Sequence, residues 1–254
     1  MNTVTITRLD PARWEAVADD RVVGHGDVSH RPDGRLFLSI DVWQDPVFDQ
    51  LATVMLADLP EPLHTVVGED DHELRSRWER LGFTVGRRER EYVLPTDGHG
   101  TGLGARRPAA DVTILPAGEA EASLLRALDR AIREEVEATV GWRTMPAEVL
   151  PGPAGCLPVD PSKHAVAVRD GEYVGLVRVV RVRRRARIGL IAVRADRRGH
   201  GIGRTLLAHA LGALHRDGTD SAWAEVDESN TAAIALAEGA GGRRSGGYLE
   251  LVRR

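Results

Sequence analysis

Residues 187–216 (RIGLIAVRADRRGHGIGRTLLAHALGALHR) limit most strongly what this chain can fold into. Positions 188–194 are apolar almost throughout, which is typical of a strand covered on both faces. From Leu206 onward, leucines and alanines recur at the 3.6-residue spacing of a helix, and Gly218 is placed to end that helix. The segment therefore predicts a buried strand, a glycine-rich turn and a helix in direct succession.

The turn between strand and helix, residues 194–204, combines glycines with arginines. Gly199, Gly201 and Gly203 let the backbone turn tightly and direct its N–H groups into one concavity. The start of the following helix adds unpaired donors and a partial positive charge. Arginines at positions 194, 197, 198 and 204 surround this turn. The composition predicts a phosphate-rich ligand.

Two common phosphate loops do not match this turn. A Walker loop requires a glycine at position 198 and a lysine at position 204, and both positions hold arginine. The dinucleotide fingerprint also fails at Arg204. The remaining pattern is Arg198-x-x-Gly201-x-Gly203 after a strand, which resembles the acyl-CoA pyrophosphate loop of the GNAT superfamily of N-acetyltransferases. An ordinary strand–turn–helix with a solvated arginine turn is the alternative.

A second stretch, residues 223–236 (WAEVDESNTAAIAL), is similar to a motif of GNAT enzymes such as the ribosomal-protein alanine N-acetyltransferases. The resemblance implies that Glu225 acts as general base and that Asn230 contacts CoA. Strand alternation places Trp223 and Glu225 on one face. The alternatives are a helix N-cap for Asn230 and an edge or surface carboxylate for Glu225.

The chain departs from the family pattern at the position of the usual acid. The tyrosine that the family places seven residues after the asparagine is Ala237 here, and the usual Gly-Phe after this helix is Gly241-Gly242. Tyr248, at the start of the last predicted strand, is the candidate acid. Tyr173 lies beside a turn, where we expect it to be exposed.

The resemblance implies acetyl-CoA as cosubstrate, bound along the central strand and the turn. In the family this strand diverges from its neighbour, so a backbone N–H near Val193 could stabilise the oxyanion. The implied contacts are Ile191, Ala192, Val193, Arg198, Gly199, His200, Gly201, Ile202, Gly203, Arg204, Thr205 and Asn230. We expect no metal, because the histidines of this half lack a zinc-ligand pattern.

The two halves of the chain show the same order of elements, which indicates a tandem arrangement. Both halves contain a hairpin followed by Val-Gly, and both close a helix with a glycine after Leu81 or Ala240. The predicted fold class is α/β (α+β), with two GNAT-like domains that each have a mixed central sheet flanked by helices. The predicted boundaries are a domain at 1–94, a linker of Pro/Gly-rich composition at 95–110 and the acyltransferase domain at 111–254.

The first half has no acyl-CoA loop in its sequence. The corresponding stretch is 41–46 (DVWQDP), where Asp41, Asp45 and Asp49 would repel a pyrophosphate and no glycine frees the backbone. We interpret this half as degenerate and structural. Its Trp14, Trp43 and Trp78 are available for packing against the second half.

Composition narrows the function classes. The net charge of −4 argues against a general nucleic-acid binder, and the arginine-rich stretch 178–187 has no interleaved aromatics, as expected of a solvated hairpin end. A single cysteine, Cys156, excludes an internal disulfide and suits a reducing cytoplasm. No membrane span and no signal-peptide pattern are expected.

The sequence thus predicts an N-acetyltransferase that transfers an acetyl group to an amine of a small molecule or a peptide. A non-catalytic acyl-CoA sensor, an O-acyltransferase on the same fold and an RNA-associated protein are the alternatives. The acceptor is not encoded in any motif, because its pocket is built from variable loops, and neither is the oligomeric state.

Overall fold

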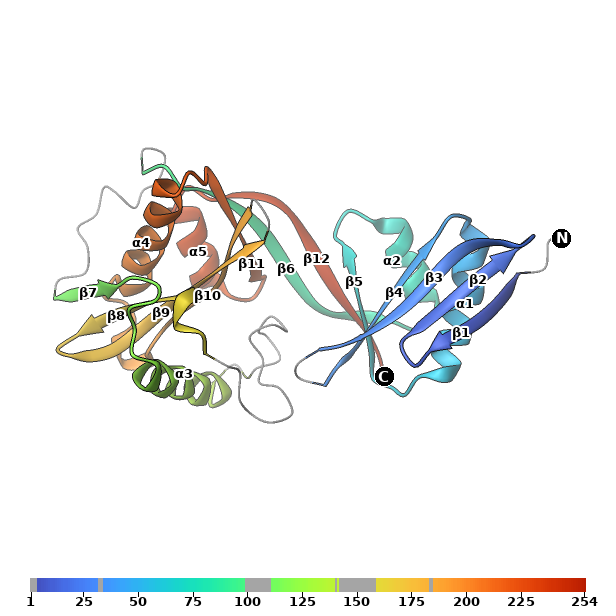
Figure 1. The fold of residues 1–254 in the computed structure, drawn as a ribbon, viewed down its shortest axis with the longest axis horizontal. Coiled ribbons are helices and arrows are strands. Elements are labelled where there is room, and N and C mark those ends of the chain that lie inside the picture. The colour runs from blue at the N-terminus through green and yellow to red at the C-terminus, as the bar shows by residue number, and fades with distance from the viewer. Residues whose placement is uncertain (1–3, 32–33, 99–110, 140, 142–158, 183–184) are drawn as a thin grey trace. The chain divides into compact units, whose positions relative to one another are not determined.

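The computed structural model describes residues 4–31, 34–98, 111–139, 141, 159–182 and 185–254 (Figure 1). They fall into two compact units, one built mainly from residues 4–88 and 248–254, the other mainly from residues 89–247. Each unit is a sheet with helices packed on it. This confirms the α/β (α+β) class with mixed sheets expected from the sequence.

The first unit contains two helices on one face of a six-stranded sheet. Its elements are β1 (Thr5–Asp10), β2 (Arg13–Ala18), β3 (Arg21–His30), β4 (Leu36–Val42), α1 (Asp45–Asp58), β5 (Leu63–Gly68), α2 (His72–Arg80) and the first part of β6 (Thr84–Pro95). The strand order is β1-β2-β3-β4-β5-β12, in which β4 and β5 are parallel and the pairs β1–β2, β2–β3, β3–β4 and β5–β12 are antiparallel. Asp19 and Asp20 take the positive φ angles of a tight hairpin turn.

The core of the first unit is aromatic. Trp78 on α2 packs edge-on against Phe48 of α1 and against Phe83, with ring centroids 5.1 Å and 4.8 Å apart. Trp14 is fully buried and donates its Nε1 hydrogen to Asp58 at 3.0 Å. The expectation that Trp14 and Trp78 pack against the other half is wrong, because both lie in the core of their own unit.

The second unit has helices on both faces of its sheet. Its elements are β7 (Val112–Leu115), α3 (Ala122–Glu137), β8 (His164–Arg169), β9 (Glu172–Val182), β10 (Arg185–Val193), α4 (Ile202–Arg216), β11 (Ser221–Asp227), α5 (Thr231–Gly239) and the first part of β12 (Arg243–Arg253), with short 3-10 turns at Pro161–Lys163 and Ala195–Arg197. The strand order is β6-β11-β10-β9-β8-β7. The helix α3 begins at Ala122, with Glu121 as its N-cap.

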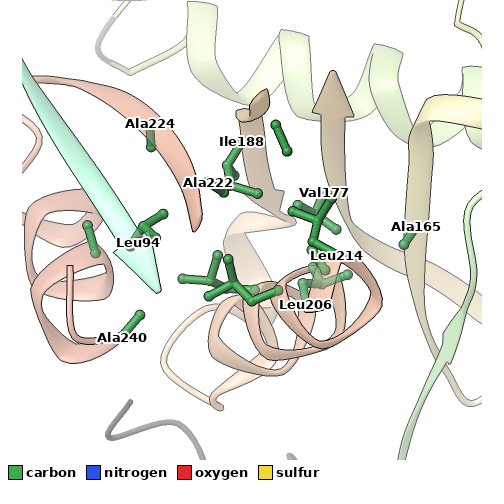
Figure 2. Packing of buried hydrophobic residues seen from close by; sticks show 14 of the residues in the cluster. Leu94, Ala165, Val177, Ile188, Leu206, Leu214, Ala222, Ala224 and Ala240 are labelled. Carbon is green, nitrogen blue, oxygen red and sulfur yellow. The ribbon is translucent and has the colours of Figure 1, made fainter. Parts of the chain in front are cut away.

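Alternating residues of these strands face α3 on one side and α4 with α5 on the other. Val166 and Leu176 pack with the apolar face of α3. Ala222 and Ala224 of β11 pack with the leucines of α4 in the larger cluster, which Figure 2 shows together with Leu94 of β6. We call the two sides of this sheet the α3 face and the α4 face.

Two long strands, β6 and β12, each have one part in the first unit and one part in the second. Residues 84–88 of β6 belong to the first unit, whereas residues 89–95 belong to the second and pair antiparallel with the whole of β11. Conversely, β12 starts in the second unit, and its residues 248–253 pair with β5 in the first. Each unit therefore takes a strand segment from the other half of the chain. The boundaries expected at 94 and 110 stay a prediction, and residues 99–110 of the expected linker lie outside the described part.

Candidate active site

The parallel strands β10 and β11 diverge soon after they begin. They pair at Ala186–Ala222 and Arg187–Trp223, and these two fully described strands show no further pair up to Val193 and Asp227. β10 stays paired with β9 as far as Val193–Gly175, with a bulge between Ile188 and Leu190. The edge of β10 that faces β11 is therefore open along residues 188–193, which include Ile191, Ala192 and Val193. Backbone groups on that edge can bond to an extended ligand.

The glycine loop follows this open edge directly. Gly199 and Gly201 both have φ +81°, a conformation that favours glycine, and a Cβ at either position would meet nothing within 4 Å. Gly201 is the N-cap of α4 and brings no side chain to cap the helix, so the first N–H groups of α4 face outward. Ile202 is buried, and Thr205 bonds back to the carbonyl of Gly201. This geometry fits the phosphates of a CoA thioester, because an open helix N-terminus binds anions.

The arginines around the loop divide into two groups. Glu135 of α3 accepts from Arg194 Nε at 2.6 Å and raises the pKa of that guanidinium, while Arg197 pairs with Glu172 and Asp196. Both guanidinium groups are therefore held by carboxylates of the second unit in this structure.

The other two arginines of the loop, and its histidine, are not bound to carboxylates of the described residues. Arg198 and Arg204 form no ion pair with any described residue, and Arg198 Nε donates to the carbonyl of Val193 at 3.1 Å. His200 is exposed at the variable position of the loop, with Nδ1 3.4 Å from the carbonyl of Arg197. Arg198 and Arg204 are the loop cations left for a phosphate.

Trp223 and Glu225 lie on the α3 face of β11, as strand alternation predicts, because Ala222, Ala224 and Val226 point into the core on the α4 face. The carboxylate of Glu225 is not an isolated surface group. It forms an ion pair with Arg187 of β10, and the two side chains are only 20 % and 15 % exposed. This placement corrects the expectation that the whole arginine-rich stretch is solvated.

Asn230 caps α5, because its side chain accepts a hydrogen bond from the N–H of Ala233 at 3.0 Å. The N-cap interpretation is thus confirmed, and a CoA contact by Asn230 stays a prediction. Ala237 is buried on the same helix. Of the two, Asn230 follows the end of β11 that diverges from β10.

The three tyrosines of the chain have different surroundings. Tyr248 pairs with Gly68 in the first unit and is 37 % exposed, whereas Tyr173 is not exposed as expected but accepts a hydrogen bond from the N–H of Glu121 at 3.1 Å. Tyr92, which sequence reasoning missed, is buried in the core of the second unit and donates to Glu238 of α5 at 3.0 Å. It was missed because β6 precedes the predicted boundary, although the alternation of that strand indicates that Tyr92 and Leu94 share a buried face.

The first unit repeats the strand geometry without the loop. β4 and β5 are parallel and pair only at Leu36–Leu63 and Phe37–His64, both strands being fully described. However, α1 begins at Asp45, whose carboxylate is 2.7 Å from the guanidinium of Arg77, so an acid already occupies that helix N-terminus. A pyrophosphate there would meet like charge.

No group of three metal-ligating side chains occurs among the described residues, and no helix in that part is long and apolar enough to cross a membrane.

Comparisons with known proteins agree with this architecture. Residues 128–241 match the model of the acetyltransferase (GNAT) family. The chain is 47 % identical over 51 residues to [ribosomal protein bS18]-alanine N-acetyltransferase of Escherichia coli, which is 20 % of this chain and 34 % of that protein. It is 40 % identical over 60 residues to N-alpha-acetyltransferase 30 of Saccharomyces cerevisiae, 24 % of this chain and 34 % of that protein. The match spans about a third of the length of these curated relatives.

Two solved structures share the fold over nearly the whole chain. A GCN5-related N-acetyltransferase from Sphaerobacter thermophilus has a TM-score of 0.66 at 19 % identity, covering 97 % of this chain and 82 % of that one. A tandem GNAT protein from the clavulanic acid biosynthesis pathway has a TM-score of 0.64 at 17 % identity, covering 95 % and 83 %. Residues 128–241 therefore match the GNAT acetyltransferase family model, and the chain shares the fold of these GNAT structures.

Proposed function

We propose that the second unit is an N-acetyltransferase that uses acetyl-CoA to acetylate an amine of a small molecule or a peptide. The observation that carries the proposal is the divergence of β10 from β11 directly beside the open glycine loop at the start of α4. The open edge of β10 offers backbone hydrogen bonds to the extended thioester arm, and the glycine loop offers N–H donors to the pyrophosphate. The two relatives named above are N-acetyltransferases, which supports the same reaction class.

The reaction follows from the groups that surround this opening. The amine nitrogen attacks the thioester carbon, the carbon–sulfur bond breaks, and the ammonium proton must pass to a base. Glu225 is the candidate base, directly or through one water, because it lies on the α3 face where the strands diverge. A backbone N–H of β10 near Val193 stabilises the oxygen that becomes negative in the tetrahedral state.

The departing thiolate does not depend on a strong acid. A CoA thiol resembles cysteine, with a pKa of about 8.5, so the thiolate can leave and then take a proton from water. Tyr248 stays our weakest proposal for a proton donor, since it is paired with Gly68 in the first unit. We propose that the reaction runs in the cytoplasm.

We also propose that the first unit is a degenerate GNAT domain without acetyl-CoA. Its support is Asp45 with Arg77 at the start of α1, where the second unit has Gly201 and no acid in the first turn. The first unit then has a structural role, and the strand segment 89–95 that follows it in the chain belongs to the second unit.

The test combines binding with transfer. Titration calorimetry should give one acetyl-CoA per chain, and release of CoA should be detected with a member of a panel of small amines, polyamines and peptide N-termini. Two equivalent sites would contradict the degenerate first unit. Binding without CoA release from any amine would instead identify a non-catalytic acyl-CoA-binding protein.

A further inference from the structure

The α3 face of the second unit carries three arginines near the divergence of β10 and β11. Arg133 of α3 is bound to Asp129 at 2.5 Å, with both side chains 16 % exposed. Arg187 of β10 is bound to Glu225. Arg178 of β9 is half-buried like them, but it forms no hydrogen bond or ion pair with any residue that the structure describes. One cation on this face thus lacks the carboxylate that the other two have.

Arg178 reaches from its own strand to the start of the divergence. It is two residues from Leu176, which packs with α3, so its side chain leaves the sheet on the same side. Its Nη1 lies 3.7 Å from the position that a Cβ of Gly189 would take. Gly189 is the residue at the bulge of β10, two positions after the last pair with β11. A side chain larger than a methyl group at position 189 would compete with this guanidinium for space.

Among the residues that the structure describes, the neighbours of Arg178 do not neutralise its charge. His164 is opposite Arg178 in the β8–β9 register and is only 7 % exposed. Burial lowers the pKa of His164, the nearby charge of Arg178 adds to this effect, and the Nδ1 hydrogen is donated to the carbonyl of Asp160 at 2.7 Å. The imidazole is therefore neutral at pH 7. On the facing helix α3, Asp129 is already bound to Arg133 and Glu135 to Arg194.

The proposed chemistry requires the acceptor to approach from this same face. Glu225, the proposed base, projects from the α3 face of β11, so the amine that gives up its proton must lie on that side of the sheet. A half-buried guanidinium without a counter-charge has lost hydration that only an anion restores well. Its planar fork binds a carboxylate or a phosphate through two parallel hydrogen bonds.

We propose that Arg178 binds an acidic group of the acceptor, so that the preferred substrates are amines that also carry a carboxylate or a phosphate. This inference rests on the proposed acetyltransferase function and names its substrate class. Neutral amines would reach the same opening without that contact. Arg178 is then the residue that determines specificity rather than one that takes part in proton transfer.

The experiment compares matched acceptors in the full-length protein. One pair is an amino acid and its amide, and the other is 2-aminoethyl phosphate and ethanolamine. The kcat/KM of each compound is measured for the wild type and for Arg178→Gln, so that the intrinsic reactivity of each amine cancels. Arg181→Gln is the matched control, because Arg181 lies on the same strand but pairs with Asp217 after α4.

Arg178→Gln should lower kcat/KM about 10–100-fold for the acidic member of a pair, the value of a hydrogen bond to a charged group, and leave its neutral partner nearly unchanged. Acetyl-CoA affinity should stay the same, and Arg181→Gln should not discriminate within a pair. Comparing the loss in the amino acid pair with the loss in the 2-aminoethyl phosphate pair shows whether Arg178 binds a carboxylate or a phosphate. Equal losses within both pairs, or a wild type that prefers neutral amines, would overturn the inference while leaving the acetyltransferase function intact. Failure to bind acetyl-CoA would overturn both.

Discussion

Arg187 and Glu225 form an ion pair at the last position where β10 and β11 are bonded to each other. The pair therefore closes the narrow end of the opening in which we place the thioester. Arg187 donates to Oε2 of the carboxylate, which leaves Oε1 to accept a proton from an attacking amine or a bridging water. Arg187 thus holds the proposed base in place from the neighbouring strand.

The first prediction separates catalysis by Glu225 from a structural role in this pair. Glu225→Gln should lower kcat about 10²–10⁴-fold when chemistry limits turnover, with acetyl-CoA affinity nearly unchanged. Arg187→Gln breaks the same pair but keeps the carboxylate. It should therefore lower the free energy of unfolding by about as much as Glu225→Gln does, and it should lower kcat by much less than Glu225→Gln does. Stopped-flow rates and denaturant titrations check both variants. An unaltered rate and pH profile in Glu225→Gln would remove Glu225 from the mechanism.

The second prediction concerns the glycine loop. Gly201→Asp should abolish acetyl-CoA binding, because the substitution places a carboxylate at the helix N-terminus where the pyrophosphate is expected. Gly218→Asp is the matched control, because Gly218 follows the C-terminal end of α4. Its φ is +77°, close to the +81° of Gly201, and a Cβ at either position would meet nothing within 4 Å. Both variants have the same backbone strain, so calorimetry should show loss of binding in the first alone. Equal losses would indicate unfolding of α4 rather than a phosphate site.

Local sequence signals predicted the parts of the site that depend on neighbours in the chain. The helix after the glycine loop begins at Ile202 and ends at Arg216, and Asp170-Gly171 forms the expected tight turn with φ 53° and 79°. Both outcomes follow from backbone preferences within a few residues. The N-cap role of Asn230 belongs to the same group.

Long-range pairing was beyond those signals. β12 begins at Arg243 rather than at Tyr248, because polar residues at the start of the strand hide its alternation. The partner of Glu225 is 38 positions away on a parallel strand, and a pair of that kind has no sequence period. The assignment of Tyr92 to the core of the second unit was equally hard to predict. No local sequence pattern indicates that a strand following the first unit pairs in the sheet of the second.

The third prediction concerns the anchor of the loop on α3. The carboxylate of Glu135 accepts from Arg194 Nε at 2.6 Å and from the N–H of Ala195 at 2.8 Å, which fixes the point where β10 becomes the loop. Glu135→Gln should weaken acetyl-CoA binding about 3–10-fold, because losing about 1 kcal/mol of loop ordering outweighs the removal of one screened charge. Asp129→Asn, which breaks an ion pair within α3 away from the loop, is the control. Tighter binding in Glu135→Gln would show instead that the released Arg194 contacts a phosphate.

The last prediction follows from the strand exchange. A fragment of residues 111–254 lacks the segment that pairs with every residue of β11 from Ser221 to Asp227, and it lacks Tyr92 and Leu94, which are both 1 % exposed in the core. We expect this fragment to aggregate, because it exposes both an unpaired strand edge and the apolar surface of α4 and α5. A fragment of residues 89–247 keeps this strand, omits the part of β12 that pairs with β5, and should be soluble and bind acetyl-CoA.

In the full-length protein the same strand can be tested by single substitutions. Leu94→Ala should lower the free energy of unfolding by about 2–5 kcal/mol, because it opens a cavity in the core of the second unit. The adjacent Val93 is 38 % exposed on the other face, so Val93→Ala should cost far less. Denaturant titrations compare the two. If residues 111–254 alone are soluble and acetylate the same acceptor as the full chain, the strand segment 89–95 is dispensable and the second unit is complete without the first half.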